Sequence, residues 1–159
     1  MSAPRLCFVC MGNICRSPLA EGVFKHLAAQ AQWECHVESA GTGDWHVGEA
    51  PDPRSQRVAH AHGLRLTSRA QQFRAADFAR CDYVFALDED IAADLRALAR
   101  TPAELSKIHL LREHDPRANG DLNGPDPYYG GPEGFERVYE MIDRSCRELI
   151  QRFGDSLNR

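Results

Sequence analysis

The sequence has no apolar run long enough to cross a membrane and no excess of basic residues. The apolar stretch near the N-terminus covers only Leu6 to Met11, whereas a membrane-spanning helix needs about 20 apolar residues. No signal-peptide hydrophobic region follows Arg5. Nineteen Lys and Arg against 23 Asp and Glu give a net charge of −4, which argues against broad binding to nucleic acid or anionic lipid. We therefore expect a cytoplasmic protein with no membrane span and no nucleic-acid partner, whose charge still allows one local anion site.

The sequence also lacks internal repeats, low-complexity tracts and a boundary between domains. Its 159 residues are 43% hydrophobic and 26% charged, which is typical of a globular chain rather than a disordered or fibrous one. A chain of this length buries roughly 68–70% of its unfolded surface, so it needs no metal or disulfide for a stable core. We expect residues 1–159 to form a single domain.

Cysteine spacings that hold structural metals are missing as well. Cys7 and Cys10 form one C-x-x-C pattern, but no second pair completes a zinc site. Both residues fall on an expected strand, where side chains three positions apart point to opposite faces. Disulfide frameworks are typical of short secreted chains, and nothing here indicates secretion. We therefore expect neither a shared metal nor a thioredoxin-type redox pair at Cys7 and Cys10.

The sequence does contain a regular alternation of strand and helix patterns. Short apolar runs predict strands at 6–10, 35–39, 83–87 and 108–111. Helical spacing of apolar residues predicts helices at 18–30, 53–62 and 88–100, and a long C-terminal helix with apolar positions from 135 to 153. The first helix is expected to have Ser17 as its cap and Pro18 as its first residue. Strands separated by helices imply βαβ crossovers, so the expected fold class is α/β, with a four-stranded parallel twisted sheet and helices on both faces.

One segment, residues 112–131, shows no regular pattern. It contains three prolines and four glycines, and it includes the pair Tyr128 and Tyr129. A loop of this length in a compact domain is usually functional or disordered. Because two adjacent aromatic residues argue against disorder, we expect a functional loop.

The loop after the first expected strand combines the features of an anion site. Ligands of open parallel sheets bind beyond the carboxyl ends of the strands, and a helix N-terminus presents unpaired N–H groups and the positive end of its dipole. Gly12 and Asn13 tolerate unusual backbone angles, and Arg16 can grip phosphate-like oxygens with two prongs. The Gly-Lys-Ser/Thr ending of a Walker loop is missing. The loop therefore predicts a cradle for a tetrahedral oxyanion.

Cys10 lies at the bottom of this cradle, at the end of the strand. A free cysteine on a strand is often only a core residue. The amides, the dipole and Arg16 that favour a bound anion also favour a thiolate, and the spacing C-x5-R-S leads directly into a helix. We interpret Cys10 as an ionised nucleophile directed at phosphorus.

The segment from Val9 to Pro18 resembles the signature of the low-molecular-weight protein tyrosine phosphatases. Further segments follow in the order of that family: Ser39-Ala40-Gly41, Trp45, Pro51-Asp52-Pro53-Arg54, His62-Gly63, Asp88-Glu89 and Asp126-Pro127-Tyr128-Tyr129. The resemblance covers nearly the whole chain. It implies a flavodoxin-like, phosphotyrosine phosphatase I-like fold and an enzyme with no metal and no other cofactor.

The resemblance also implies a role for each motif residue. Cys10 attacks phosphorus, Arg16 holds the phosphate oxygens, and Asp126 protonates the leaving phenolate and then activates water to hydrolyse the cysteinyl-phosphate. Trp45 and Tyr128 resemble the walls of a deep slot that favours phosphotyrosine over the shorter phosphoserine. The expected substrate-binding residues are Met11, Gly12, Asn13, Ile14, Cys15, Ser17, Trp45, Tyr128 and Tyr129.

Several supporting roles follow from the same resemblance. Asn13, Ser39 and His62 are expected to form a hydrogen-bond network that holds the loop, with Asp88 orienting His62. Ser17 has two candidate roles: a hydrogen bond to the Cys10 sulfur and a helix cap. Cys15 is either a small filler beneath the loop or the partner of Cys10 in a reversible protective disulfide.

Other functions are compatible with parts of the pattern. Thioredoxin-coupled arsenate reductases share the loop, but they need two further redox cysteines after the third strand, where this chain offers only Cys81. Arginine phosphatases carry Thr at the position of Ile14. A phosphopeptide-binding module without activity would be expected to lack one of the three catalytic residues. We expect phosphotyrosine proteins as partners, with a cognate tyrosine kinase as a candidate, and a monomer or weak dimer.

Overall fold

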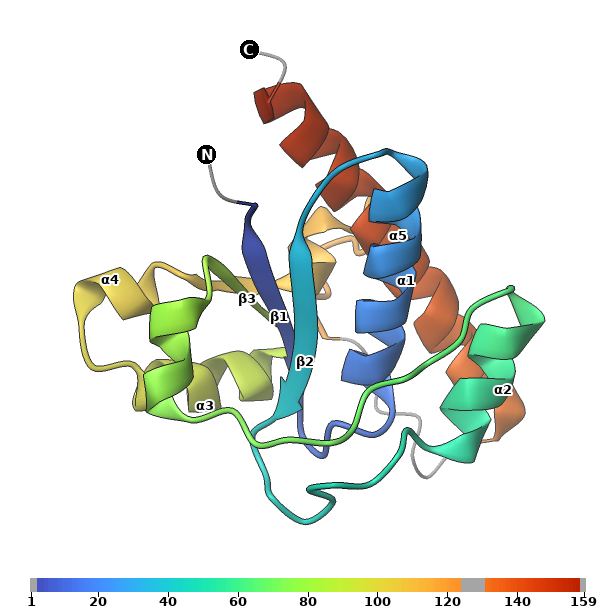
Figure 1. Ribbon diagram of the computed structural model, residues 1–159, viewed down its shortest axis with the longest axis horizontal. Helices are drawn as coiled ribbons and strands as arrows, with labels where there is room; N and C mark the ends of the chain where they lie inside the picture. The colour runs from blue at the N-terminus through green and yellow to red at the C-terminus, as the bar shows by residue number, and fades with distance from the viewer. Residues whose placement is uncertain (1–2, 124–130, 158–159) are drawn as a thin grey trace.

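The computed structural model describes residues 3–123 and 131–157, which form one twisted sheet covered by helices on both faces (Figure 1). The strands are β1 (Arg5–Cys10), β2 (His36–Gly41), β3 (Tyr83–Ala86) and β4 (Ile108–Leu110). They lie in the order β2-β1-β3-β4, and all three pairings are parallel. The α/β fold with a four-stranded parallel sheet is therefore confirmed.

The helices follow the strands in the expected alternation. They are α1 (Arg16–Gln30), α2 (Pro53–Ala61), α3 (Glu89–Leu98), α4 (Pro102–Leu105) and α5 (Pro132–Leu157), with short 3-10 helices η1 (Ala75–Arg80) and η2 (Leu111–His114). The sequence analysis missed α4, η1 and η2. The segment 112–131 is therefore not irregular throughout, because η2 occupies its start.

The two faces of β1 contribute to two separate cores. Phe8 and Cys10 pack on the face covered by α1 and α5, whereas Cys7 and Val9 pack on the face covered by η1 and α3. The Phe8 ring lies 5.5 Å from that of Phe85, and burying such a side chain stabilises the fold by about 1.5–3 kcal/mol. The prediction that Cys7 and Cys10 point to opposite faces is confirmed, so the C-x-x-C spacing cannot hold one metal ion.

Helix α1 begins two residues earlier than expected. Its cap position is Cys15, and its first residue is Arg16. The prediction that Ser17 caps the helix is wrong, because the Ser17 side chain lies within the first turn and contacts the Cys10 sulfur. Pro18 is tolerated there because the first turn of a helix leaves its N–H groups unpaired in any case. The residues that enter the helix therefore include the predicted phosphate-binding arginine.

Helix α2 lies outside the main layers, against α5 and α1. Figure 1 shows that it starts at the end of the molecule where β1 leads into α1. Asp52 caps it by accepting a hydrogen bond from the Arg54 amide. No helix within residues 3–123 and 131–157 has the length and apolar character needed to cross a bilayer.

Candidate active site

The loop between Cys10 and Arg16 is held in place by β2 and by the segment before α2. The Thr42 amide donates to the Cys10 carbonyl at 2.9 Å, and the Asp52 amide donates to the Ile14 carbonyl at 2.7 Å. Gly41 allows this close approach, since a Cβ there would lie 2.6 Å from the Met11 carbonyl oxygen. Asn13 has a φ of 57°, a left-handed conformation that asparagine tolerates better than most residues. The loop is therefore compact and fixed from two sides.

The Cys10 sulfur is buried at the base of this loop, 2.9 Å from the Ser17 hydroxyl oxygen. That oxygen also accepts a hydrogen bond from the Asn13 side-chain amide at 2.8 Å. Because the Ser17 oxygen is already an acceptor, its hydroxyl proton is available for the sulfur or for the Ala40 carbonyl at 3.3 Å. A hydroxyl in this position can stabilise a negatively charged sulfur.

A chain of side-chain hydrogen bonds extends from Asn13 to helix α1. Asn13 donates to Ser39 at 3.0 Å, and Ser39 donates to the carboxylate of Glu21 at 2.7 Å. The Gln71 amide donates to Asn13 from the other side at 3.0 Å. Sequence analysis missed Glu21 and Gln71. The spacing of Ser17, Glu21 and Lys25 at successive i,i+4 positions places them on one face of the helix and could have indicated Glu21.

Arg16 is almost fully buried, and Asp88 holds its guanidinium. Only 2% of Arg16 is exposed, and its Nη1 lies 2.7 Å from Asp88 Oδ2. The other oxygen of Asp88 accepts a hydrogen bond from the Ile91 amide at 2.8 Å and so caps α3. A buried guanidinium requires such a partner because removing its charge from water is costly. Asp88 therefore orients Arg16, and the expectation that it orients His62 is wrong.

His62 lies outside the network that holds the loop. Its Nε2 is 2.7 Å from the Glu136 carboxylate, and its ring stacks on Tyr139 with centroids 3.7 Å apart. His62 lies away from the loop between Cys10 and Arg16 because of the direction in which α2 runs. This helix starts beside the catalytic loop, and His62 follows its last residue, roughly 13 Å further along a nine-residue helix. His62 therefore joins α2 to α5 rather than supporting Asn13.

Apolar side chains form the rim of the site. Trp45 is 70% exposed, and Met11 and Val47 are also exposed. The Trp45 ring rests against Gly43, where a Cβ would lie 1.9 Å from the ring. Ile14 and Cys15 are buried instead, in a small core with Phe135. Asp126, Tyr128 and Tyr129 lie outside the described residues, so their expected roles stay predictions.

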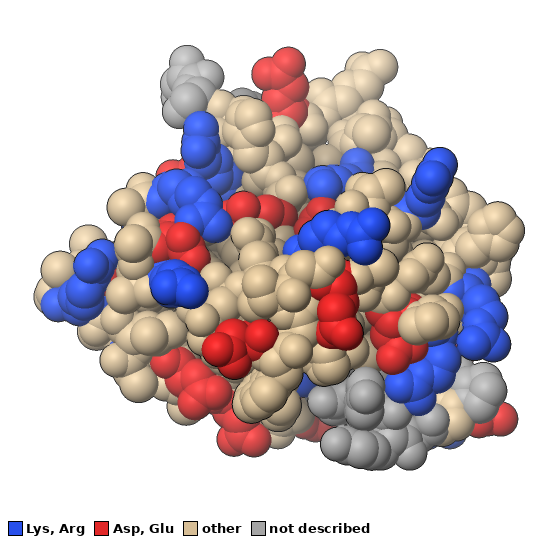
Figure 2. Space-filling view, turned by 60° about the horizontal axis from the view of Figure 1, so that its bottom comes forward, with Lys and Arg blue, Asp and Glu red and all other residues tan. Residues whose placement is uncertain are grey.

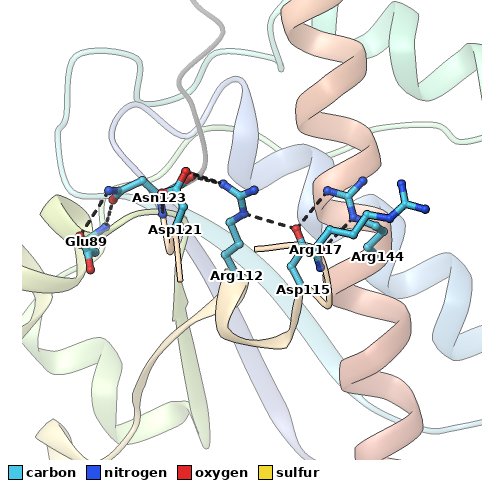
Figure 3. A network of polar contacts seen from close by, with 7 residues as sticks. All are labelled: Glu89, Arg112, Asp115, Arg117, Asp121, Asn123 and Arg144. Carbon is cyan, nitrogen blue, oxygen red and sulfur yellow. Dashed lines mark hydrogen bonds and ion pairs between the residues drawn. The ribbon is translucent and has the colours of Figure 1, made fainter. Parts of the chain in front are cut away.

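A polar network anchors the segment that precedes residue 124 (Figure 3). Arg112 Nη1 donates to the Asn123 carbonyl at 2.7 Å and to Asp121 at 3.2 Å. Asn123 in turn accepts a hydrogen bond from the Glu89 amide at 2.9 Å. Glu89 is the first residue of α3, directly after Asp88, so this segment is tied to the element that carries the partner of Arg16.

The same network contains a fully buried carboxylate, Asp115. It accepts two hydrogen bonds from Arg144 on α5, at 2.9 and 3.1 Å, and one from the Arg117 amide at 2.9 Å. Arg112 lies on its other side (Figure 3). Burial by itself raises the pKa of Asp115, but the hydrogen bonds from Arg144 and Arg117 and the charges of Arg144 and Arg112 outweigh it, so the pKa is lowered.

Replacing Asp115 by Asn is expected to lower the free energy of unfolding by about 3 kcal/mol at pH 7, because it removes the carboxylate partner of Arg144 and leaves Arg112 with Asp121 alone. A lowered pKa in the folded state means that the stabilisation is present above the unfolded pKa of about 3.9 and is lost as the pH falls through the folded value. The difference between wild type and Asp115→Asn should therefore stay constant from pH 7 to about 5 and shrink as the pH falls further toward the folded pKa, which lies below 3.8. Urea unfolding at several pH values measures it, with the exposed Asp90→Asn as control. A difference that does not change with pH would contradict this account.

The first strand of this parallel α/β sheet ends in a buried thiol, Cys10, and the loop after it leads to the buried Arg16. This arrangement defines a protein with a phosphate-binding loop and a candidate nucleophile. The family model "Low molecular weight phosphotyrosine protein phosphatase" matches residues 5–159. The chain therefore belongs to the low-molecular-weight protein tyrosine phosphatase family, and it is an enzyme of the phosphatase class. Within the described residues, no cluster of His, Cys, Asp and Glu could hold a metal ion.

Relatives and solved structures agree with this assignment. The chain is 49% identical to the low molecular weight protein-tyrosine-phosphatase of Streptomyces coelicolor, covering 92% of this chain and 91% of the relative. It is 39% identical to the human low molecular weight phosphotyrosine protein phosphatase, covering 91% and 92%. Among solved structures, a protein tyrosine phosphatase from Entamoeba histolytica with Hepes in the active site gives a TM-score of 0.92 at 33% identity, covering 97% and 99%. The Drosophila arginine phosphatase gives 0.87 at 36% identity, covering 93% and 96%.

Proposed function

We propose that the chain hydrolyses phosphotyrosine in proteins through a cysteinyl-phosphate intermediate. Cys10 is the nucleophile, Arg16 the phosphate clamp and Asp126 the general acid and base. The observation that carries this proposal is the buried Cys10 sulfur, 2.9 Å from the Ser17 hydroxyl at the base of the loop that enters α1. The loop that follows Cys10 leads into the N-terminus of α1, where unpaired amides and the helix dipole favour a bound phosphate anion.

In the first step the Cys10 thiolate attacks phosphorus opposite the tyrosyl oxygen. The S–P bond forms while the P–O bond to the phenol breaks, and Asp126 supplies the proton that the phenolate needs. Arg16 and the loop amides hold the three equatorial oxygens and stabilise the charge that they carry in the transition state. Asp88 supports this step by keeping the Arg16 guanidinium in one orientation.

In the second step a water molecule hydrolyses the cysteinyl-phosphate. The Asp126 carboxylate takes a proton from water, the new P–O bond forms, and the S–P bond breaks to release inorganic phosphate. The leaving group is the Cys10 thiolate. The Ser17 hydroxyl lies within hydrogen-bond distance of that sulfur and stabilises its charge as it departs.

Selectivity for phosphotyrosine follows from the depth of the cradle and its apolar rim. The reacting sulfur is buried, whereas Trp45 and Met11 are exposed at the edge. We expect a phenyl ring to reach from the buried sulfur to these exposed side chains, and the shorter side chain of phosphoserine to fall short of them. The expected partners are therefore phosphotyrosine proteins, with a tyrosine kinase as a candidate substrate.

The test compares matched peptides that carry phosphotyrosine, phosphoserine or phosphoarginine at one position, together with p-nitrophenyl phosphate. We expect hydrolysis of the aryl phosphate and of the phosphotyrosine peptide, inhibition by vanadate and little turnover of phosphoserine. Phosphoarginine is included because one similar structure is an arginine phosphatase. Faster release from phosphoarginine than from phosphotyrosine would contradict the proposed substrate class.

Cys15 is proposed to protect the nucleophile against oxidation. Peroxide converts the Cys10 thiolate to a sulfenic acid, and the Cys15 thiol then condenses with it to form a disulfide and release water. Because a thiol reductant reverses a disulfide, we expect wild type to recover nearly all activity after mild peroxide, and Cys15→Ser to recover several-fold less. The half-buried Cys35 supplies the control Cys35→Ser. Equal recovery of Cys15→Ser and wild type would exclude this role.

A further inference from the structure

A groove of about 760 Å³ lies between α2 and the segment 64–69 that follows it. One wall is formed by Arg57 and His60 of α2, and the other by the segment that carries Arg65 and Arg69. Pro51 and Pro53 lie at the end of the groove nearest the start of α2. None of the described residues that line it is Asp or Glu. The groove therefore combines several positive charges with no negative charge of its own.

The three arginines of the groove form no hydrogen bond or ion pair with any residue that the structure describes. The nearest carboxylate in sequence, Asp52, is held by Arg54, with Nε to Oδ1 and Nη2 to Oδ2 distances of 3.0 Å each. The hydrogen bond from Arg54 is the main cause of the lowered pKa of Asp52. Asp52 is thus bound to Arg54, and the nearby charge of Arg57 also acts on it without a hydrogen bond. Arg65 and Arg69 have no carboxylate partner among the described residues, so their charges stay available to a ligand.

Both walls of the groove are connected to the catalytic loop. The Asp52 amide, between Pro51 and Pro53, donates to the Ile14 carbonyl. On the other wall, Gln71 follows two residues after Arg69, and its amide donates to Asn13. In Figure 1, α2 and the green segment after it approach the loop between β1 and α1 at the same end of the molecule. Figure 2, which turns that end forward, shows blue groups of Lys and Arg on the right-hand side of this face.

We propose that this groove binds an acidic stretch of the substrate polypeptide next to its phosphotyrosine, an inference that rests on the proposed function. Arg65 and Arg69 are four residues apart in a segment without helical structure, so their backbones lie at most about 14 Å apart, and Arg57 faces them from α2. This spread fits several carboxylates along an extended chain better than one small anion. Because the whole protein carries a net charge of −4, an acidic substrate gains attraction only where basic side chains gather without acidic ones, as they do in this groove.

The experiment compares two phosphotyrosine peptides that differ only in their flanking residues, one with a run of Asp and Glu and one with Ser and Gln. Wild type is expected to show a kcat/KM about tenfold higher for the acidic peptide at low ionic strength, since three exposed charge pairs each contribute a modest factor. The preference should decline as salt is added, because the Debye length falls from about 10 Å at 0.1 M to about 3 Å at 1 M.

The variant Arg57→Gln/Arg65→Gln/Arg69→Gln is expected to lose this preference while hydrolysing p-nitrophenyl phosphate at the wild-type rate. The matched control is Arg96→Gln/Arg147→Gln/Arg152→Gln, which changes the net charge equally at exposed positions outside the groove. The control should keep the preference. Absence of a preference in wild type, or its equal loss in both variants, would overturn the proposal. Failure of wild type to hydrolyse p-nitrophenyl phosphate at all would instead refute the proposed function, and the groove proposal with it.

Discussion

Replacing Cys10 by Ser is expected to lower the turnover of aryl phosphates by a factor on the order of 10⁴ or more, as removal of a nucleophile does in other covalent enzymes. A serine hydroxyl is a much weaker nucleophile than a cysteine sulfur, so the attack on phosphorus is lost. The phosphate cradle of amides and Arg16 remains, so binding of a phosphotyrosine peptide should persist. Steady-state assays measure the loss of turnover, and calorimetry with the peptide measures binding.

The control for this substitution is Cys35→Ser, which changes a half-buried thiol in the connection that precedes β2. It should retain turnover within a factor of about two, because replacing sulfur by oxygen at a half-buried position outside the loop changes stability modestly and leaves the site residues in place. Turnover by Cys10→Ser within tenfold of wild type would show that another group is the nucleophile. Loss of both turnover and peptide binding would show that Cys10 also shapes the cradle.

Replacing Asp126 by Ala is expected to lower kcat by about 10²–10⁴-fold, the usual contribution of a positioned acid. The loss should depend on the leaving group. Phenyl phosphate needs a proton on its leaving oxygen more than p-nitrophenyl phosphate does, since nitrophenolate is already stabilised. The ratio of the rates for these two substrates should therefore change in the variant, and this ratio is the measurement.

Asp121→Ala is the matched control, because Asp121 is an exposed carboxylate five residues before Asp126 in the sequence and is bound to Arg112. It should leave the leaving-group ratio at the wild-type value even if it lowers the overall rate. If Asp126→Ala slows both substrates equally, Asp126 acts on the structure of the site and not as the acid.

The sequence by itself predicted the sheet and singled out the loop between Cys10 and Arg16 as the candidate phosphate site. Both depend on short-range geometry. Because side chains alternate along a strand, Cys7 and Cys10 point to opposite faces of the sheet. The five residues between Cys10 and Arg16 form a short loop that joins the strand to the helix. The predicted helix start was two residues too late because Ser17 and Pro18 match a cap pattern. In the structure the Ser17 hydroxyl lies within hydrogen-bond distance of the Cys10 sulfur instead of capping the helix.

Only the tertiary structure decided which polar side chains pair with one another. Asp88 is 72 residues from Arg16, and Glu136 is 74 residues from His62, so no local pattern fixes either pairing. The direction and length of α2 carry His62 away from the loop, and the start of α3 brings Asp88 to the guanidinium. The basic groove lies between α2 and the segment 64–69 that follows it, so it depends on how these two neighbouring segments pack. Backbone periodicity is a local property of the chain, whereas the partner of a charged side chain depends on where whole elements come to rest.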